Sequence, residues 1–111
     1  MNTLTSIYPV LAGLGFSHEE ALIFISLVEH GAQNVVFIAK KTKLSRTTVY
    51  KALDSLLDKQ RIKATNPNKR VLYEAVDPST LVSELEELSK QGTKELYQLS
   101  NKHKASLFIP V

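Results

Sequence analysis

The chain has 111 residues, of which 43% are hydrophobic and 23% charged, values typical of one globular domain and not of a disordered chain. It contains no cysteine, which excludes disulfide bonds and thiolate metal sites. The net charge is only +3, but residues 31–73 carry ten basic and two acidic side chains, a net charge of +8 that leaves −5 on the rest. We therefore expect the middle of the chain to bind a polyanion.

Two helices are predicted in the first 31 residues. Apolar residues between positions 4 and 14 recur at helical spacing, but Pro9 does not suit a helix interior, so this helix is expected to be kinked or to start near Pro9. Ser17 and Glu20 form a capping box in front of the apolar run 21–28, which predicts a second, buried helix. Gly31 is expected to end it.

Two further helices flank a predicted tight turn. Asn34 can cap a short third helix that ends around Thr42 and Lys43, and Ser45 can cap a fourth. One face of the fourth helix is apolar and consists of Val49, Ala52, Leu53, Leu56 and Leu57. The opposite face is polar and consists of Thr47, Thr48, Tyr50, Lys51 and Asp54.

The second half of the chain predicts a hairpin and a long helix. Residues 62–65 and 71–75 are candidate strands joined by a basic turn, and Asp77 and Pro78 then start a helix that runs to about residue 104. Its apolar stripe has heptad spacing until Gly92 interrupts it, which predicts a short coiled coil with a discontinuity. The stripe, expected to form a dimer interface, consists of Leu81, Leu85, Leu88, Leu96 and Leu99.

This order of elements predicts a mainly α fold with a small β-hairpin: a winged helix-turn-helix followed by a long, coiled-coil-like C-terminal helix. We expect a DNA-binding domain over residues 1–76, a dimerisation helix over 77–106 and a tail over 107–111. A reading helix enters the major groove by its N-terminal end, and the hairpin tip reaches phosphate or the minor groove. The expected DNA-binding residues are Lys40, Lys41, Lys43, Ser45, Arg46, Thr47, Thr48, Tyr50, Lys51, Lys69 and Arg70. Tyr50 could equally pack at the helix boundary.

Several short motifs follow one another in order between residues 13 and 78. They are GLGFSHEEA at 13–21, Gly31, IAK at 38–40, SRTTVYKAL at 45–53, Tyr73 and the pair Asp77-Pro78. Over about residues 4–81 they resemble the N-terminal DNA-binding domain of TrmB-type transcriptional regulators of archaea and bacteria. The resemblance implies a reading helix over 45–57, a wing over 62–75 and a dimerising helix after Pro78.

Two differences from that family's pattern stand out. The family usually has glycine at the end of the reading helix, where this chain has Gln60, followed by Arg61 where an aliphatic residue is common. Many members also continue into a C-terminal sugar-sensing domain, which this sequence does not include.

The prediction is therefore a homodimeric, sequence-specific binder of double-stranded DNA that regulates transcription. The alternative is a winged helix used as a protein-interaction module within a transcription assembly, although such a module needs no basic reading helix. An RNA binder would be expected to expose more stacking aromatic side chains. The leucine stripe could instead pack against the chain's own first helix.

Other classes of function lack their residues in this sequence. An enzyme is not expected, because there is no cysteine nucleophile, no carboxylate pair beside a histidine and no glycine-rich phosphate loop. His18, His30 and His103 are too far apart in sequence to predict a metal site, and no cofactor is expected. No signal peptide or membrane-spanning run is recognisable, so we expect a cytoplasmic protein without a membrane partner. Neither the operator nor an effector can be read from the sequence.

Overall fold

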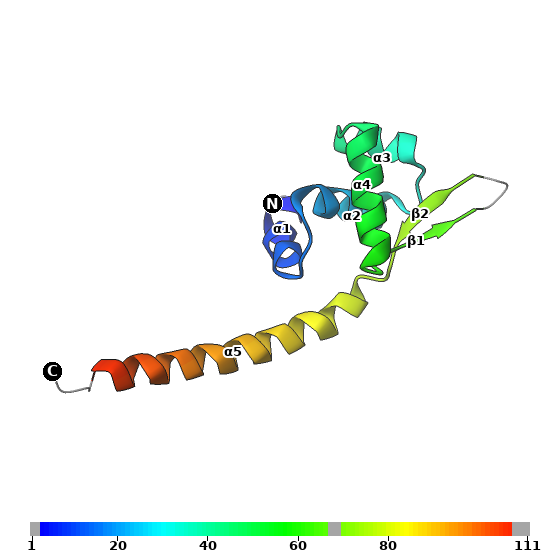
Figure 1. The fold of residues 1–111 in the computed structure, drawn as a ribbon. Helices are drawn as coiled ribbons and strands as arrows, with labels where there is room; N and C mark the ends of the chain where they lie inside the picture. Colours follow the sequence, from blue (N-terminus) through cyan, green and yellow to red (C-terminus); the bar gives the residue numbers. More distant parts are fainter. Residues whose placement is uncertain (1–2, 67–69, 108–111) are drawn as a thin grey trace. The chain divides into compact units, whose positions relative to one another are not determined.

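The computed structural model of the chain describes residues 3–66 and 70–107, with side chains described for 7–66 and 70–99. Two compact units are present, Met1–Pro78 and Ser79–Val111 (Figure 1). The first unit contains α1 (Thr3–Gly13), α2 (His18–His30), α3 (Val35–Thr42), α4 (Arg46–Asp58), β1 (Ile62–Thr65) and β2 (Leu72–Ala75). The second is the single helix α5 (Ser79–Leu107).

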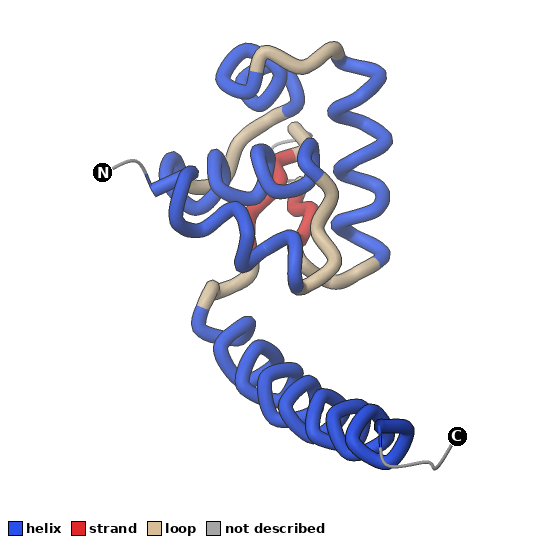
Figure 2. The backbone as a smooth tube through the Cα atoms, turned by 90° about the vertical axis from the view of Figure 1, so that its left-hand side faces the viewer, coloured by secondary structure: helices blue, strands red, loops and turns tan. Residues whose placement is uncertain are grey.

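Helix dominates the described part of the chain, which has one pair of short strands (Figure 2). The predicted fold class, a winged helix-turn-helix followed by a long C-terminal helix, is confirmed. Among the described residues no helix is both long enough and apolar enough to cross a membrane.

The first helix covers the apolar pattern predicted for it, and of the two alternatives for Pro9 the start near that residue is wrong. It does not start near Pro9 but at Thr3, and Pro9 lies inside it with an exposed side chain. An exposed position leaves water free to satisfy the carbonyl that a proline cannot bond, which limits the penalty of proline in a helix. The helix ends where Phe16 N donates to Leu11 O at 3.0 Å across Gly15, whose φ of 95° favours glycine.

The N-caps predicted for α2, α3 and α4 are all present, and the cap of α4, Ser45, is described with the interface below. Ser17 Oγ accepts from Glu20 N at 3.2 Å while Ser17 N donates to Glu20 Oε1 at 2.8 Å, which completes the capping box of α2. The Asn34 side chain accepts from the backbone N–H of Phe37 at 2.9 Å and starts α3. Gly31, at φ 79°, is the C-cap of α2 as expected.

The core of the first unit lies between α2 and the apolar face of α4. Ile23 and Leu27 from α2 are 0–1% exposed, and Leu53 and Leu56 from α4 are both fully buried. Most sides of α2 are buried, in agreement with its nearly continuous apolar run. The core fixes which face of α4 points outward, because a helix with one buried face has one direction left for its polar face.

The hairpin pairs β1 with β2 antiparallel, with Ile62 opposite Ala75 and Thr65 opposite Leu72. The second strand begins at Leu72, one residue later than predicted. Gln33, between α2 and α3, adds a bridge to Tyr73 through two backbone hydrogen bonds of 2.8 and 2.9 Å. The wing is therefore tied to the segment that leads into the helix-turn-helix.

The long helix α5 carries an exposed apolar stripe. Leu85, Leu88, Leu96 and Leu99 are 39%, 43%, 66% and 64% exposed. Leu81 differs from the other members of the predicted stripe because it is only 8% exposed.

Candidate nucleic-acid interface

The turn before α4 orients the N-terminal end of the helix. Lys43 adopts a left-handed conformation at φ 60° and caps α3, so that the chain reverses within the short link to Ser45. Ser45 Oγ accepts from Thr48 N at 3.2 Å and forms a second hydrogen bond of 2.9 Å with Thr48 Oγ1. The Thr48 hydroxyl is thereby engaged in the cap, while the first turn of α4 keeps the positive end of its helix dipole.

The outward face of α4 carries the predicted reading residues. Arg46, Thr47, Tyr50 and Lys51 are all exposed, and Thr48 is half-buried. Tyr50 is 52% exposed, so most of its ring is not used in packing. These side chains are cationic or hydrogen-bonding groups of the kind that contact phosphates and base edges.

The wing adjoins this face through Tyr73 of β2. Burial raises the pKa of the Tyr73 phenol, and the nearby Tyr50 and Asp54 raise that pKa further. Asp54 is exposed and lies one helical turn after Tyr50. The polar face of α4 therefore includes two exposed carboxylates, Asp54 beside the wing and Asp58 one turn later, among its otherwise basic and neutral side chains.

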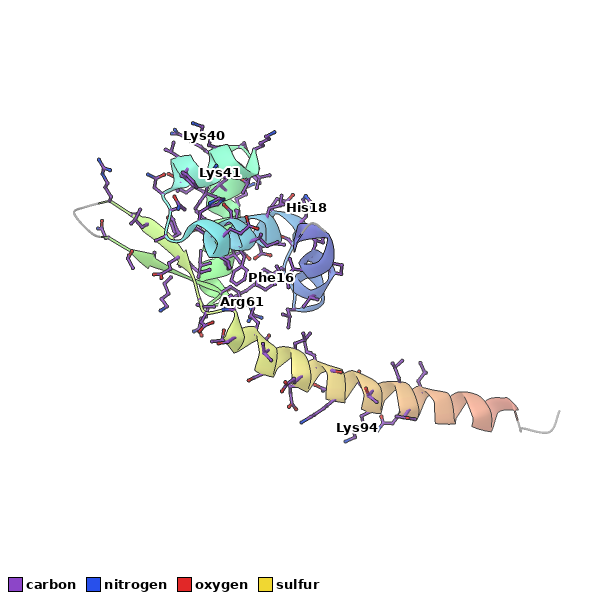
Figure 3. All side chains as sticks on the ribbon, turned by 180° about the vertical axis from the view of Figure 1, so that it is seen from behind. Phe16, His18, Lys40, Lys41, Arg61 and Lys94 are labelled. Carbon is purple, nitrogen blue, oxygen red and sulfur yellow. The ribbon has the colours of Figure 1, made fainter. Side chains whose placement is uncertain are left out.

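The last turn of α3 adds cations next to the turn. Lys40 and Lys41 are exposed and project outward in Figure 3. The Nζ atom of Lys41 lies 5.4 Å from the centre of the Phe37 ring, which itself contacts His30 edge to face at 5.7 Å. The Phe37 ring thus restrains Lys41 without burying its charge. Lys43 is exposed as well.

The tip of the wing is described in part. Arg70 is exposed and precedes β2. Lys69, which was predicted to bind DNA together with Arg70, lies outside the described residues. The surface formed by Lys40, Lys41, Lys43, Ser45, Arg46, Thr47, Thr48, Tyr50, Lys51 and Arg70 is called the basic surface below.

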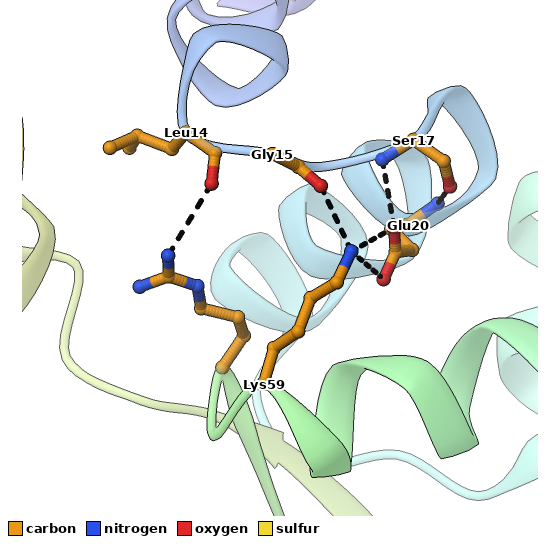
Figure 4. A network of polar contacts seen from close by, with 6 residues as sticks. Leu14, Gly15, Ser17, Glu20 and Lys59 are labelled. Carbon is orange, nitrogen blue, oxygen red and sulfur yellow. Dashed lines mark hydrogen bonds and ion pairs between the residues drawn. The ribbon is translucent and has the colours of Figure 1, made fainter.

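Two of the ten cations between residues 31 and 73 form contacts within the protein and are not part of the basic surface. Lys59, the C-cap of α4, places Nζ 2.9 Å from Glu20 Oε1 and 2.9 Å from the carbonyl oxygen of Gly15 (Figure 4). The Arg61 guanidinium donates to the carbonyl of Leu14 at 3.4 Å, and its central carbon lies 5.4 Å from the centre of the Phe16 ring. Both residues therefore anchor the C-terminal end of α4 to the segment between α1 and α2.

These two contacts correct the charge count made from the sequence. Ten basic residues were counted between positions 31 and 73, but Lys59 and Arg61 are engaged within the protein. Their partners lie 39 and 47 residues away in the sequence, so no local pattern indicates them. Figure 3 shows Arg61 beside Phe16 and apart from Lys40 and Lys41.

Gln60 takes the conformation for which the family's glycine is suited. Its φ is 60°, Gln60 N donates to Leu57 O at 3.0 Å, and Arg61 N donates to Leu56 O at 2.9 Å. This is the hydrogen-bond pattern of a helix end with a left-handed residue, which glycine adopts without strain. The reading helix therefore ends with a left-handed residue, although that residue is glutamine and not glycine.

The histidines have structural contacts in the described residues. The Tyr8 hydroxyl is hydrogen-bonded to Nδ1 of His18, and His30 contacts Phe37. Within the part of the chain that the structure describes, no three His, Cys, Asp or Glu side chains are grouped as a metal site would require.

Comparison with known proteins identifies one family. The family described as "Sugar-specific transcriptional regulator TrmB" matches residues 11–79, which include α2, α3, α4 and both strands of the wing. No curated protein matches the chain.

Solved structures share the fold. TrmBL2, an archaeal chromatin protein, is 20% identical with a TM-score of 0.68, and the match covers 96% of this chain and 41% of that one. A possible transcriptional regulator from Methanosarcina mazei is 13% identical with a TM-score of 0.69, covering 84% of this chain and 83% of that one. The apo-Zalpha domain of zebrafish PKZ is 34% identical over 55% of this chain and 100% of its own, with a TM-score of 0.52.

Proposed function

Because the chain belongs to the TrmB family of sugar-specific transcriptional regulators, we propose that its winged unit binds double-stranded DNA sequence-specifically and that the protein acts as a homodimer. The observation that carries the DNA-binding proposal is the polar face of α4. Its capped N-terminal end presents Arg46, Thr47 and Lys51 to solvent while its opposite face is buried in the core. TrmBL2, which has the same fold, is described as showing a novel mode of DNA binding.

The basic surface divides into two roles by position. Arg46, Thr47 and Tyr50 lie in the first turns of α4, where a reading helix contacts base edges in the major groove. Lys40, Lys41 and Arg70 flank that helix on α3 and on the wing, where they would contact backbone phosphates. The first group would confer sequence preference, and the second would confer affinity for any duplex.

A dimer would give the protein two reading helices for one site. The supporting observation is the stripe Leu85, Leu88, Leu96 and Leu99, whose exposed fractions of 39% to 66% are large for leucine side chains. Covering these side chains with a second copy removes their apolar surface from water, at roughly 25 cal/mol per Å². Binding of both half-sites by linked units then raises the affinity for a full site.

The test of DNA binding is a titration of a labelled duplex with the protein between about 50 and 300 mM salt, a range over which the electrostatic screening length falls from about 14 to about 6 Å. Because several cations neutralise phosphates, the logarithm of the association constant should fall steeply with the logarithm of salt, by about 0.9 for each phosphate contacted. The substitution Lys94→Ala, on exposed α5 and outside the basic surface, is the control and should leave the slope unchanged. A nearly flat dependence would contradict DNA binding and favour the protein-interaction alternative.

Sedimentation of the full chain at micromolar concentration tests the dimer separately. Two copies per particle are expected. A protein that stays monomeric at this concentration contradicts the dimer but leaves the DNA titration valid for a single winged unit.

A further inference from the structure

The leucine stripe of α5 is symmetric about Gly92. Leu88 and Leu96 lie four residues before and after Gly92, and Leu85 and Leu99 lie seven residues before and after it. All four leucines are exposed. At 3.6 residues per turn they share one face of the helix with Gly92. Reversing the direction of the helix about Gly92 therefore places leucine on leucine at these four positions.

The spacing between these positions is symmetric as well. From residue 85 to residue 99 the steps are three, four, four and three residues. The two central steps of four are a stutter, which locally unwinds a left-handed coiled coil and straightens the seam. In either orientation the stutter lies at the middle of the four leucines, so the spacing permits an antiparallel pair centred on Gly92, and the charges of the helix distinguish that pair from a parallel one.

The charge of the helix changes sign at the same residue. Residues 79–91 contain Glu84, Glu86 and Glu87 against one lysine, and residues 93–107 contain three lysines against Glu95, giving net charges of −2 and +2. A parallel pair would bring like-charged halves together, and an antiparallel pair brings opposite charges together. Charges that flank a helix seam set the orientation of the partner in this way, whereas Lys94 lies on the side opposite the leucines and acts only through the overall charge of its half.

We propose that α5 pairs antiparallel with α5 of a second copy, with the two-fold axis of the dimer at Gly92. The proposal rests on the homodimer proposed above and specifies its geometry. Leu85 then contacts the partner's Leu99, and Leu88 contacts the partner's Leu96. Gly92 has nothing within 4 Å of the position that a Cβ atom would occupy, so its own chain leaves the place open to the partner.

This geometry sets the separation between the first residues of the two copies of α5. Gly92 follows Ser79, the first residue of α5, by thirteen residues. At about 1.5 Å per residue the first residues of the two antiparallel helices lie about 40 Å apart, close to the roughly 34 Å between successive major-groove faces. In a parallel pair the same residues would lie about 10 Å apart.

Cysteine cross-linking can test the orientation cleanly, because the chain contains no cysteine of its own. Leu85→Cys and Leu99→Cys are prepared as separate full-length proteins, oxidised alone and then oxidised as a mixture. Leu88→Cys and Leu96→Cys form a second pair in case one substitution weakens the dimer. Lys94→Cys, on the opposite side of α5 from the stripe, is the control for random collision.

The antiparallel dimer predicts a disulfide-linked dimer in the mixture of Leu85→Cys and Leu99→Cys at least tenfold more abundant than in either protein alone. Efficient cross-linking of Leu85→Cys with itself would overturn the antiparallel geometry and indicate a parallel dimer. Sedimentation of the unsubstituted chain distinguishes the remaining outcomes. A dimer that yields no cross-link with either pair uses another surface and overturns the inference, whereas a monomer overturns the proposed homodimer itself.

Discussion

Lys59 Nζ lies 2.9 and 3.0 Å from the two carboxylate oxygens of Glu20, so the last turn of the reading helix is joined to the first turn of α2 by a two-point ion pair. The Glu20 side chain is 4% exposed and that of Lys59 is 39% exposed. Because Glu20 also accepts the Ser17 N–H of the capping box, one carboxylate holds both the start of α2 and the end of α4. The ion pair therefore fixes the direction in which α4 leaves the core.

Removing the cation alone should destabilise the first unit. Lys59→Met leaves the Glu20 carboxylate buried without its charged partner, and we expect a loss of about 1–3 kcal/mol in the free energy of unfolding. The partly exposed lysine keeps this loss below that of a fully buried pair. Urea denaturation measures it, and the double variant Lys59→Met with Glu20→Gln should recover part of the loss. A double variant no more stable than Lys59→Met would contradict a role for the charge.

Stability should also depend on pH through Glu20. Burial raises the pKa of this carboxyl, but the hydrogen bonds from Lys59, from the Ser17 backbone and from Ser55 outweigh burial and lower the pKa below its ordinary value of 4.5. A carboxyl with a lowered folded pKa stabilises the fold above its unfolded pKa and loses that effect as the pH falls through the folded pKa. The stability difference between the native protein and Glu20→Gln should therefore shrink below about pH 4.5. A difference that stays constant from pH 7 to pH 3 would contradict this assignment.

The end of the reading helix offers a stabilising substitution. Gln60 holds φ 60°, a conformation that strains residues with a Cβ atom. Gln60→Gly should raise the free energy of unfolding by about 0.5–1 kcal/mol, since relief of strain exceeds the added entropy of the unfolded chain. Gln91→Gly, in the interior of α5, is the matched control and should lower helix stability by a similar amount. Destabilisation by Gln60→Gly would show that the glutamine side chain contributes more than the strain removes.

The short-range features of this fold could be predicted from the sequence, and the long-range contacts could not. Ser17, Asn34 and Ser45 were identified as caps because a cap depends on residues three positions away. The contacts of Lys59 and Arg61 depend instead on how the end of α4 meets the segment between α1 and α2. The count of basic residues included both cations in the basic segment, although neither was among the predicted DNA-binding residues, and the structure uses both in the fold.

For α1 the sequence left the start open between the beginning of the apolar pattern and Pro9, and it gave no sign of the burial of Leu81. Proline usually marks a helix boundary, but an exposed Pro9 is accommodated inside α1. Leu81 continues the leucine periodicity of α5, and periodicity alone does not distinguish a leucine that is buried from one that is exposed. The bridge between Gln33 and Tyr73 had no sequence signal, because it involves a single residue on each side.

Substitutions within the basic surface should separate reading from phosphate binding. Arg70→Ala should weaken binding to all duplexes about equally and reduce the salt slope by about 1. Arg46→Ala should in addition reduce the preference for the specific site, by about 1–3 kcal/mol for a lost base contact. Competition between the specific duplex and a shuffled duplex measures both effects, with Lys94→Ala as the control. If the two arginine variants lose affinity and preference in the same proportion, the division of roles between α4 and the wing is wrong.

The last prediction concerns Gly92, at the centre of the proposed dimer interface. Glycine in a helix interior destabilises it by about 1 kcal/mol relative to alanine, and a Cβ atom at this position meets nothing within 4 Å in its own chain. Gly92→Ala should therefore raise the helicity of α5 and tighten the dimer, by up to about tenfold in Kd for each 1.4 kcal/mol gained across the two copies. Thr93→Ala is the control: Thr93, whose hydroxyl donates to the Ser89 carbonyl at 2.8 Å, lies off the leucine stripe, so this substitution raises helix propensity by less than Gly92→Ala, adds no atom to the interface and should tighten the dimer less. Circular dichroism and sedimentation equilibrium measure helicity and Kd. A variant with higher helicity but a weaker dimer would mean that the two helices approach too closely at this residue to accept a methyl group, which would keep the two-fold axis at Gly92 but reverse the sign of the effect.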